Sequence, residues 1–318
     1  MATEEHLALL KQGVVVWNEW CRQNPEASPN FEGAGLNQAD LCQVNFQEAA
    51  LYTVNLREAK LRQANFSRAN LTEADLCMAN LESANLIKAD LCMANLYTAT
   101  LYKSNLREAN LYKADLREAT LSQGDLCMAN LREANLSQSE LCMANLYTAT
   151  LYKSNLREAN LYKADLREAD LCMANLREAN LSHANLSLAN LCMADLIGAN
   201  LYKANLREAN LSLTNVCMVN FILANLYKAV LIGANLLGAN LYKANLTQAN
   251  LSEASLREAS LCMTNLSMAN LKKADLSLAN LREANLAQAS LVGASLDGAT
   301  LEGANLQGTI MPDGTIHD

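Results

Sequence analysis

The sequence predicts an all-β solenoid built from five-residue units, and three observations lead to that fold class. Every fifth residue from Phe31 to Leu306 is Leu, Phe or Val, and no insertion breaks the register. Ala commonly stands two residues before each of these central positions, and Asn or Asp commonly stands one residue before. So strict a period is typical of proteins in which similar structural units stack on one another.

The five-residue period fits neither standard secondary structure. On an α-helix the central residues would spiral around the axis, because five residues advance about 140° beyond a full turn. On a flat strand, side chains alternate between the two faces with period two. A short extended stretch followed by a turn resolves the conflict. The central residue and the preceding Ala then both point inward.

Four bends close a square, which predicts a coil of four units and parallel pairing between coils about 4.8 Å apart. The repeat would then contain about 14 coils of this kind. Three-sided and five-sided coils satisfy the same geometry. Asn and Asp suit the position before the central residue, because they bond to nearby backbone, tolerate turn conformations and stack into ladders. The predicted core includes the central residues Leu81, Leu106, Leu126, Leu156, Leu171 and Phe221.

An α-helical cap is predicted before the repeat, because a solenoid otherwise exposes its core at the end. Over residues 3–23 the apolar side chains recur at the spacing of one amphipathic helix: Leu7, Leu10, Val14, Trp17 and Cys21. Asn24 and Pro25 end this helix. We interpret four residues as a lid over the first coil: Leu10, Val14, Trp17 and Trp20. The alternative is an aromatic docking site for a partner.

The C-terminal end of the repeat has a different composition. Glycine takes the same position in four consecutive units, at Gly293, Gly298, Gly303 and Gly308. The following tail reads as a turn that ends the repeat. Two arrangements fit the last coil. It pairs weakly with a second copy through its strand edges, which gives a homodimer, or the tail covers it. The predicted division is 1–30 for the cap and linker, 31–310 for the repeat and 311–318 for the tail.

The repeating unit resembles that of a known family. ANLES at 79–83 and ADLRE at 164–168 are similar to the A(D/N)LXX motif of pentapeptide repeat proteins, and the similarity covers about 280 of the 318 residues. The Trp-Asn helix before the repeat resembles that of cyanobacterial members. The resemblance implies a right-handed quadrilateral parallel β-helix with Leu and Ala inside. It implies little about activity, since most members have no assigned biochemistry and a minority mimic DNA and act on type II topoisomerases.

Nine of the ten cysteines directly follow a central residue, at a position that we expect to face outward. Exposed thiols suit a reducing compartment. The acidic start of the chain speaks against a signal peptide, and no apolar run is long enough to cross a membrane. The sequence therefore predicts a cytoplasmic protein that does not enter a membrane.

Met follows eight of these cysteines. We favour duplication of one LCMAN unit as the explanation, and the alternative is a surface that binds soft metal ions such as Cu(I). Cys172 and Cys192 are one predicted coil apart, so we expect their thiols to stack within disulfide reach and to be reduced in the cell.

The sequence gives no sign of catalysis. The three histidines, His6, His183 and His317, are dispersed along the chain, so no catalytic set with Ser, Asp or Cys can be assembled around them. The sequence also contains no glycine-rich phosphate-binding loop and no Cys/His cluster with metal-ligand spacing. We therefore expect no catalytic residue, no cofactor-binding residue and no metal ligand. The chain is predicted to be a non-enzymatic scaffold that presents repetitive flat faces to a protein partner.

The alternative function is a DNA mimic that regulates a type II topoisomerase or another nucleic-acid enzyme, since the net charge is −8. A mimic needs a long stripe of one sign, because duplex DNA carries one phosphate charge per ~1.7 Å of axis. The two positions after each central residue instead carry 22 Lys or Arg and 17 Asp or Glu. This mixture favours the scaffold, and we do not expect nucleic acid as a partner.

Overall fold

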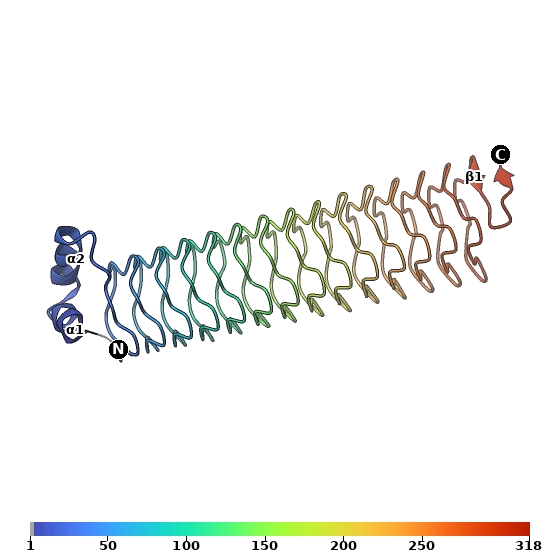
Figure 1. Cartoon of the computed structure of the whole chain (residues 1–318). Helices are drawn as coiled ribbons and strands as arrows, with labels where there is room; N and C mark the ends of the chain where they lie inside the picture. The colour runs from blue at the N-terminus through green and yellow to red at the C-terminus, as the bar shows by residue number, and fades with distance from the viewer. Residues whose placement is uncertain (1–2) are drawn as a thin grey trace. The chain divides into compact units, whose positions relative to one another are not determined.

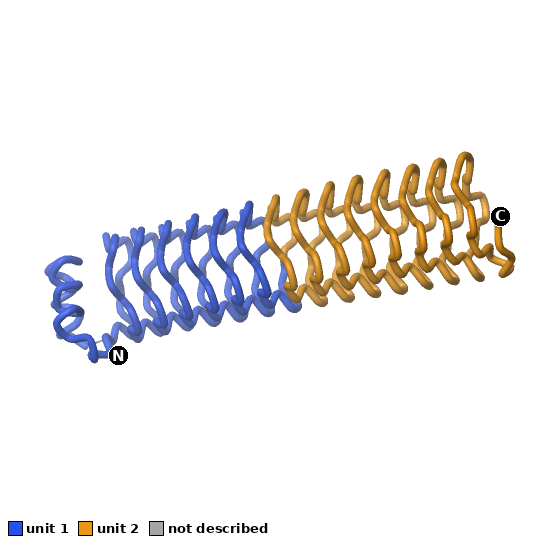
Figure 2. The backbone as a smooth tube through the Cα atoms, turned by 90° about the horizontal axis from the view of Figure 1, so that it is seen from above, with its two compact units in different colours: residues 1–155 blue, residues 156–318 orange. Residues whose placement is uncertain are grey.

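The structure is a computed structural model that describes residues 3–318; residues 1 and 2 of the predicted N-terminal segment lie outside the described residues. The chain divides into two compact units, unit 1 ending at Asn155 and unit 2 spanning Leu156–Asp318 (Figure 2). Within each unit the backbone winds through successive coils of the same form (Figure 2). Among the described residues, no helix has both the length and the apolar character that a membrane span needs.

Each coil contains 20 residues and four turns. Isolated parallel bridges join residues 20 apart, such as Asn30 with Ala50 in unit 1 and Asn160 with Asn180 in unit 2. A turn of two residues separates successive bridge positions. Because only one residue lies in the ladder between one turn and the next, the sides of a coil are bridges and not extended strands.

Backbone hydrogen bonds within and between coils explain the five-residue unit. The N–H of Leu56 donates to the carbonyl oxygen of Asp75 in the next coil at 2.7 Å. Two residues later, the N–H of Glu58 donates to the carbonyl oxygen of Cys77 at 2.9 Å. The N–H of Ala59 donates back to the carbonyl oxygen of Leu56 at 3.0 Å and closes the turn.

The two remaining N–H groups of this unit also have partners. The N–H of Lys60 donates to the carbonyl oxygen of Ala39 in the preceding coil at 3.0 Å. The N–H of Arg57 donates to Oδ1 of Asn55 at 3.1 Å. The Asn side chain thus completes the hydrogen bonding of the five N–H groups, which explains why Asn and Asp dominate the position before the central residue.

The left-handed turn conformation lies elsewhere than we expected. Asn and Asp were expected to tolerate it, but the residue two after each central position adopts it, with φ between 53° and 63° at the non-glycine positions. A positive φ at the third residue is typical of type II turns, for which glycine is best suited. Gly293 and Gly308 stand at this position with φ of 69° and 66°. The four C-terminal glycines therefore remove strain as well as side chains.

Both kinds of inward residue lie in the interior, central residues and Ala alike. In unit 1, Leu81, Leu106 and Leu126 are buried. In unit 2, Leu156, Leu171 and Phe221 have no exposed area. Stacked layers of Leu and Ala, with a few Phe and Val, therefore form the core of each unit.

Two helices precede the coils of unit 1, α1 (Glu4–Lys11) and α2 (Val14–Gln23) (Figure 1). The prediction of one helix over residues 3–23 was wrong. Gly13 separates the two helices with φ 112°, a backbone conformation that only glycine adopts readily. The second helix ends directly before Asn24 and Pro25.

The C-terminal tail folds back beside the last coil of unit 2. Strand β1 (Thr309–Ile310) pairs antiparallel with β2 (Ile316–His317). The N–H of Gly308 donates to the carbonyl oxygen of His317 at 2.7 Å. Other central residues of this coil remain half-exposed, at Leu296, Leu301 and Leu306. The tail therefore covers only part of the coil.

Candidate interaction surfaces

Trp17 of α2 is fixed against the first coils. It has no exposed area, and its Nε1 donates to the carbonyl oxygen of Asn45 at 2.8 Å. Its ring stacks on Trp20 with centroids 5.1 Å apart, and meets the edge of Phe31 at the same separation. Trp17 therefore covers the first rings of the core and offers no aromatic surface to a partner.

Polar groups of the N-terminal segment satisfy the open edge of the first coil. Oδ1 of Asn18 accepts the N–H of Asn45 at 2.8 Å, and its Nδ2 donates to the carbonyl oxygen of Gln43 at 2.9 Å. Nδ1 of His6 accepts the N–H of Asn30 at 3.1 Å. Sequence reasoning placed no role on Asn18 or His6. The signal was an Asn next to Trp17, because an amide can replace a missing neighbouring strand.

The other residues predicted for the cap differ in exposure. Leu10 is buried, whereas Val14 and Trp20 are half-buried. Val15 is 83% exposed. An apolar surface thus remains on the outer side of α2, next to the covered face that contains Trp17.

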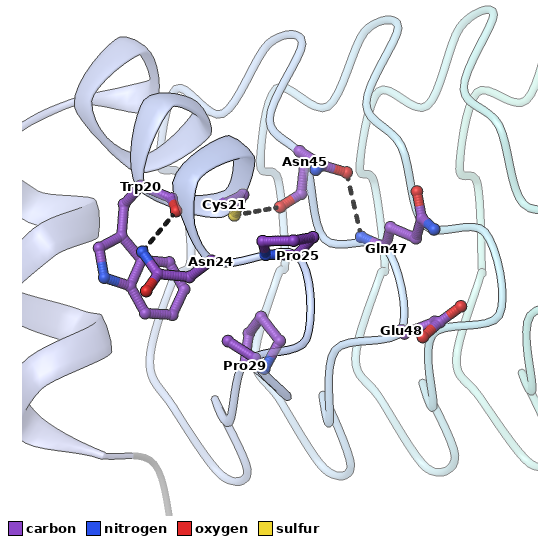
Figure 3. A pocket seen from close by; sticks show the side chains of 9 residues that line it. Trp20, Cys21, Asn24, Pro25, Pro29, Asn45, Gln47 and Glu48 are labelled. Carbon is purple, nitrogen blue, oxygen red and sulfur yellow. Dashed lines mark hydrogen bonds between the residues drawn. The ribbon is translucent and has the colours of Figure 1, made fainter.

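A cleft of about 150 Å³ lies where α2 meets the first coils (Figure 3). Its polar groups already bond to one another. Nδ2 of Asn24 donates to the carbonyl oxygen of Trp20 at 2.9 Å, and the Cys21 thiol approaches the carbonyl oxygen of Asn45 at 3.7 Å (Figure 3). Burial raises the pKa of Cys21, which disfavours the reactive thiolate. We therefore interpret the cleft as a structural contact between α2 and the first coils, and not as a ligand site.

The outward turn positions form rows in which opposite charges meet across coils. In unit 1, Arg62 approaches Glu82 at 3.2 Å. In unit 2, Arg177 pairs with Asp195 of the next coil at 3.2 Å. In these two pairs a neighbouring cation therefore neutralises the acidic group. The pairs are solvent-exposed and contribute about 0–1 kcal/mol each.

Tyrosine, lysine and histidine alternate on one side of unit 2. The Nζ of Lys163 lies 5.1 Å from the centroid of the Tyr162 ring, and Lys203 repeats this contact with Tyr202. His183 stands between the two tyrosines, edge-on at 5.7 Å and 5.5 Å. The aromatic row is continuous over these coils, a feature that the sequence reasoning missed. The available signal was the 40-residue spacing of Tyr162 and Tyr202, with His183 one position beyond the midpoint between them.

The cysteine position is less exposed than expected. We expected these thiols to face outward, but Cys77 and Cys127 are buried and the other repeat cysteines are half-buried. Coils about 4.8 Å apart bring side chains of the first turn residue against their equivalents above and below, which covers them. Cys172 and Cys192 occupy the same turn position on adjacent coils, where the N–H of Met173 donates to the carbonyl oxygen of Cys192 at 2.9 Å. Burial, and next the Cys192 thiol, raise the pKa of Cys172.

Over residues 3–318, no three side chains among His, Cys, Asp and Glu gather closely enough to hold a metal ion. Within each unit, the turn positions present periodic rows of side chains with mixed charge. The amides before the central residues form the ladder and cap the turns.

Comparison with known proteins identifies the repeat. A family model described as pentapeptide repeats matches the chain in segments between residues 30 and 312. A search of curated proteins finds no match.

Three solved structures are among those similar to this chain. HetL, a pentapeptide repeat protein involved in heterocyst differentiation regulation from the cyanobacterium Nostoc sp. strain PCC 7120, is 41% identical over 67% of this chain and 91% of HetL, with a TM-score of 0.32. The pentapeptide repeat protein Rfr23 from the cyanobacterium Cyanothece 51142 is 25% identical over 48% of this chain and 91% of its own, with a TM-score of 0.19. Full-length QnrB1, a plasmid-mediated fluoroquinolone resistance protein, is 18% identical over 68% of this chain and 92% of QnrB1, with a TM-score of 0.25. The family model confirms the resemblance seen in the units ANLES and ADLRE: the chain belongs to the pentapeptide repeat family.

Proposed function

We propose that this protein is a non-enzymatic scaffold whose repeating flat faces bind a protein partner. Pentapeptide repeat proteins fold as right-handed quadrilateral β-helices and are generally non-enzymatic structural or interaction proteins. The observation that carries the proposal is the regular display of turn side chains, two per unit, on a backbone that hydrogen bonds join from coil to coil. Such a surface is pre-organised, so a partner binds it without ordering the backbone.

Exposed apolar side chains on the turns support a protein partner. Met128 in unit 1 is 54% exposed, and in unit 2 Leu213 and Met218 are 61% and 70% exposed. Methionine is flexible and polarizable, and suits binding surfaces that adapt to a partner. The charged rows around these residues would add register and selectivity more than affinity.

We further propose the organisation that the repeat implies. Residues 1–30 form a helical cap and linker, residues 31–310 form one repeat domain of about 14 coils, and residues 311–318 form a tail. A weak homodimer through the C-terminal coil is supported by the half-exposed Leu296, Leu301 and Leu306 beside the hairpin. The thiol-rich repeat supports a cytoplasmic location, because free thiols persist in a reducing compartment.

The second candidate is the DNA mimic that acts on a type II topoisomerase. The net charge of −8 favours it. The ion pairs across coils, such as Arg282 with Glu302 at 2.6 Å, oppose it because they break any stripe of one sign. We expect no inhibition of DNA supercoiling by gyrase at low micromolar protein. Potent inhibition would reverse the ranking of the two functions.

Site-specific photo-crosslinking tests the scaffold. A photoreactive residue at Met128 or Met218 should give protein adducts in extracts of the source cells, because both side chains point into solvent from a turn. The matched control is Lys11, an exposed residue of α1. Adducts that arise only from Lys11, or only with nucleic acid, would contradict binding of a protein partner by the faces of the repeat.

A further inference from the structure

We propose that the consecutive Cys-Met turns of unit 2, at residues 172–173 and 192–193, form a binding site for one soft monovalent metal ion, Cu(I) in class. Two thiolates would hold the ion, from Cys172 and Cys192. The thioethers of Met173 and Met193 would lie beside it on the solvent side. This binding activity is separate from the scaffold role and does not depend on it.

The backbone places these two turns in register. The N–H of Leu171 donates to the carbonyl oxygen of Asn190 at 2.7 Å, and the N–H of Met173 donates to the carbonyl oxygen of Cys192 at 2.9 Å. These two hydrogen bonds join the coils on either side of Cys172. The two cysteines are held side by side by the ladder, before any metal binds.

Each cysteine is also fixed by its own cap. The N–H of Cys172 donates to Oδ1 of Asp170 at 3.1 Å, and that of Cys192 donates to Oδ1 of Asn190 at 3.3 Å. Nδ2 of Asn190 donates to Oδ1 of Asp170 at 2.9 Å and ties the two caps together. The ligand pair is therefore built on rigid backbone, as a selective metal site requires.

The spacing between coils matches a two-coordinate ion. A metal–thiolate bond of about 2.3 Å on each side spans about 4.6 Å. Neighbouring strands lie about 4.8 Å apart. A linear sulfur–metal–sulfur unit therefore fits between the two thiols after small rotations of the side chains. Cu(I), with a filled d shell, accepts two-coordinate binding.

The ligand types select a soft ion. Thiolate and thioether sulfur favour Cu(I), whereas Mg²⁺ and Ca²⁺ require oxygen ligands. Met173 and Met193 are 42% and 46% exposed, and the cysteines that precede them are half-buried. Each thiol therefore has a solvent-accessible thioether, itself a soft ligand, on the next residue.

The sequence provides this pair only once. Other Cys-Met units recur along the repeat, but no other two cysteines are 20 residues apart. Ser212 takes the cysteine position in the next coil, and Leu213 takes the methionine position. Cys217 and Met218 form an isolated unit on another side, with Ile197 and Leu237 at the corresponding positions 20 residues before and after. Duplication explains why the Cys-Met unit recurs along the repeat. Only at residues 172 and 192 does a second cysteine stand at the same position of the next coil.

The test is an anaerobic titration of the reduced full-length protein with Cu(I), in competition with the chelator bicinchoninate. We expect one tightly bound Cu(I) per chain. Cys172→Ser and Cys192→Ser should each weaken that binding at least tenfold. Cys217→Ser is the matched control and should leave it unchanged. All three variants should fold, because Ser212 already stands at this position, and thermal melting followed by circular dichroism verifies it.

Two further measurements separate this site from binding by scattered thiols. X-ray absorption of the one-equivalent complex should show sulfur as the only first-shell ligand. Replacing Met173 and Met193 together by Leu should weaken binding less than loss of either cysteine. The proposal is overturned if bicinchoninate retains the first equivalent. It is also overturned if Cys217→Ser weakens binding as much as Cys172→Ser, or if nitrogen or oxygen ligands dominate the absorption spectrum.

Discussion

Single amide side chains connect the coils of this protein. Oδ1 of Asn205 accepts the N–H of Arg207 at 3.3 Å and the Nδ2 of Asn225 at 3.1 Å. Its own Nδ2 donates to Oδ1 of Asn185 at 3.0 Å. One residue therefore caps a turn and continues a ladder. A buried polar group that loses such partners costs about 1–3 kcal/mol.

Asn205→Ala should lower the free energy of unfolding by about 1–3 kcal/mol, because it leaves the Arg207 N–H and two amide groups with one partner fewer. Chemical denaturation followed by circular dichroism measures the change. Met218→Ala is the control, since Met218 is 70% exposed and its loss should change stability by less than about 0.5 kcal/mol. Equal effects from the two substitutions would show that the amide ladder is unimportant.

Asp275 should make the stability of the protein depend on pH, because its stabilising contribution is lost in acid. Hydrogen bonds from the side chain and then the backbone N–H of Ser277 hold the pKa of Asp275 below its usual value. A carboxyl with a lowered folded pKa stabilises the fold above the unfolded pKa of about 3.9, and this stabilisation is lost as pH falls through the folded pKa. Asp275→Asn keeps Oδ1 and should reduce the dependence of stability on pH below about 4. An unchanged pH profile would refute this role.

Some residue positions were predictable from the sequence and others were not. The inward Leu and Ala follow from the period alone, since only a bent chain buries both. The left-handed turn residue does not, because Glu58, Lys103 and Met128 adopt it without any intrinsic preference for positive φ. The ladder and the turn hydrogen bond impose it, at about 1–2 kcal/mol per residue. Glycines such as Gly198 and Gly233 at this position were the only hint.

At the scale of elements, the N-terminal helices replace the coil that would precede the first one. Helical spacing in the sequence predicted apolar contacts for Leu10 and Trp17, and both are buried. It could not predict the break at Gly13, because a glycine within a helical pattern is often tolerated. Nor could it predict that Asn18 bonds to the edge of the first coil, since hydrogen bonds between distant segments leave no periodic trace.

Trp17→Ala should release α2 from the first coil. The substitution removes a fully buried ring and the hydrogen bond to Asn45, at a cost of about 3–5 kcal/mol. Hydrogen exchange should accelerate over residues 14–23 and at the Asn45 N–H. Val15→Ala is the control on the same helix, because Val15 is 83% exposed. If exchange at Asn45 stays slow after loss of Trp17, the helix does not protect the coil.

At the scale of the whole molecule, both units combine a uniform interior with a varied surface. The interior determines the fold, and the burial of its Leu and Ala was predicted from the sequence, because these two side chains recur in register. The surface determines function, and there the sequence predicts little. Ion pairs such as Arg62 with Glu82, and the row from Tyr162 to Tyr202, depend on which turns become neighbours, and this is known only once the coil length is fixed.

The coil length is therefore the central claim, and disulfide trapping tests it most directly. Each chain carries Cys172, one partner cysteine and serine at the remaining cysteine positions. A four-unit coil brings Cys192 beside Cys172, a three-unit coil would bring residue 187, and a five-unit coil would bring residue 197. Under mild oxidation, peptide mapping should find the 172–192 disulfide and neither the 172–187 disulfide of Ser187→Cys nor the 172–197 disulfide of Ile197→Cys. A preference for residue 187 or 197 would contradict the four-sided coil and the neighbour relations that follow from it.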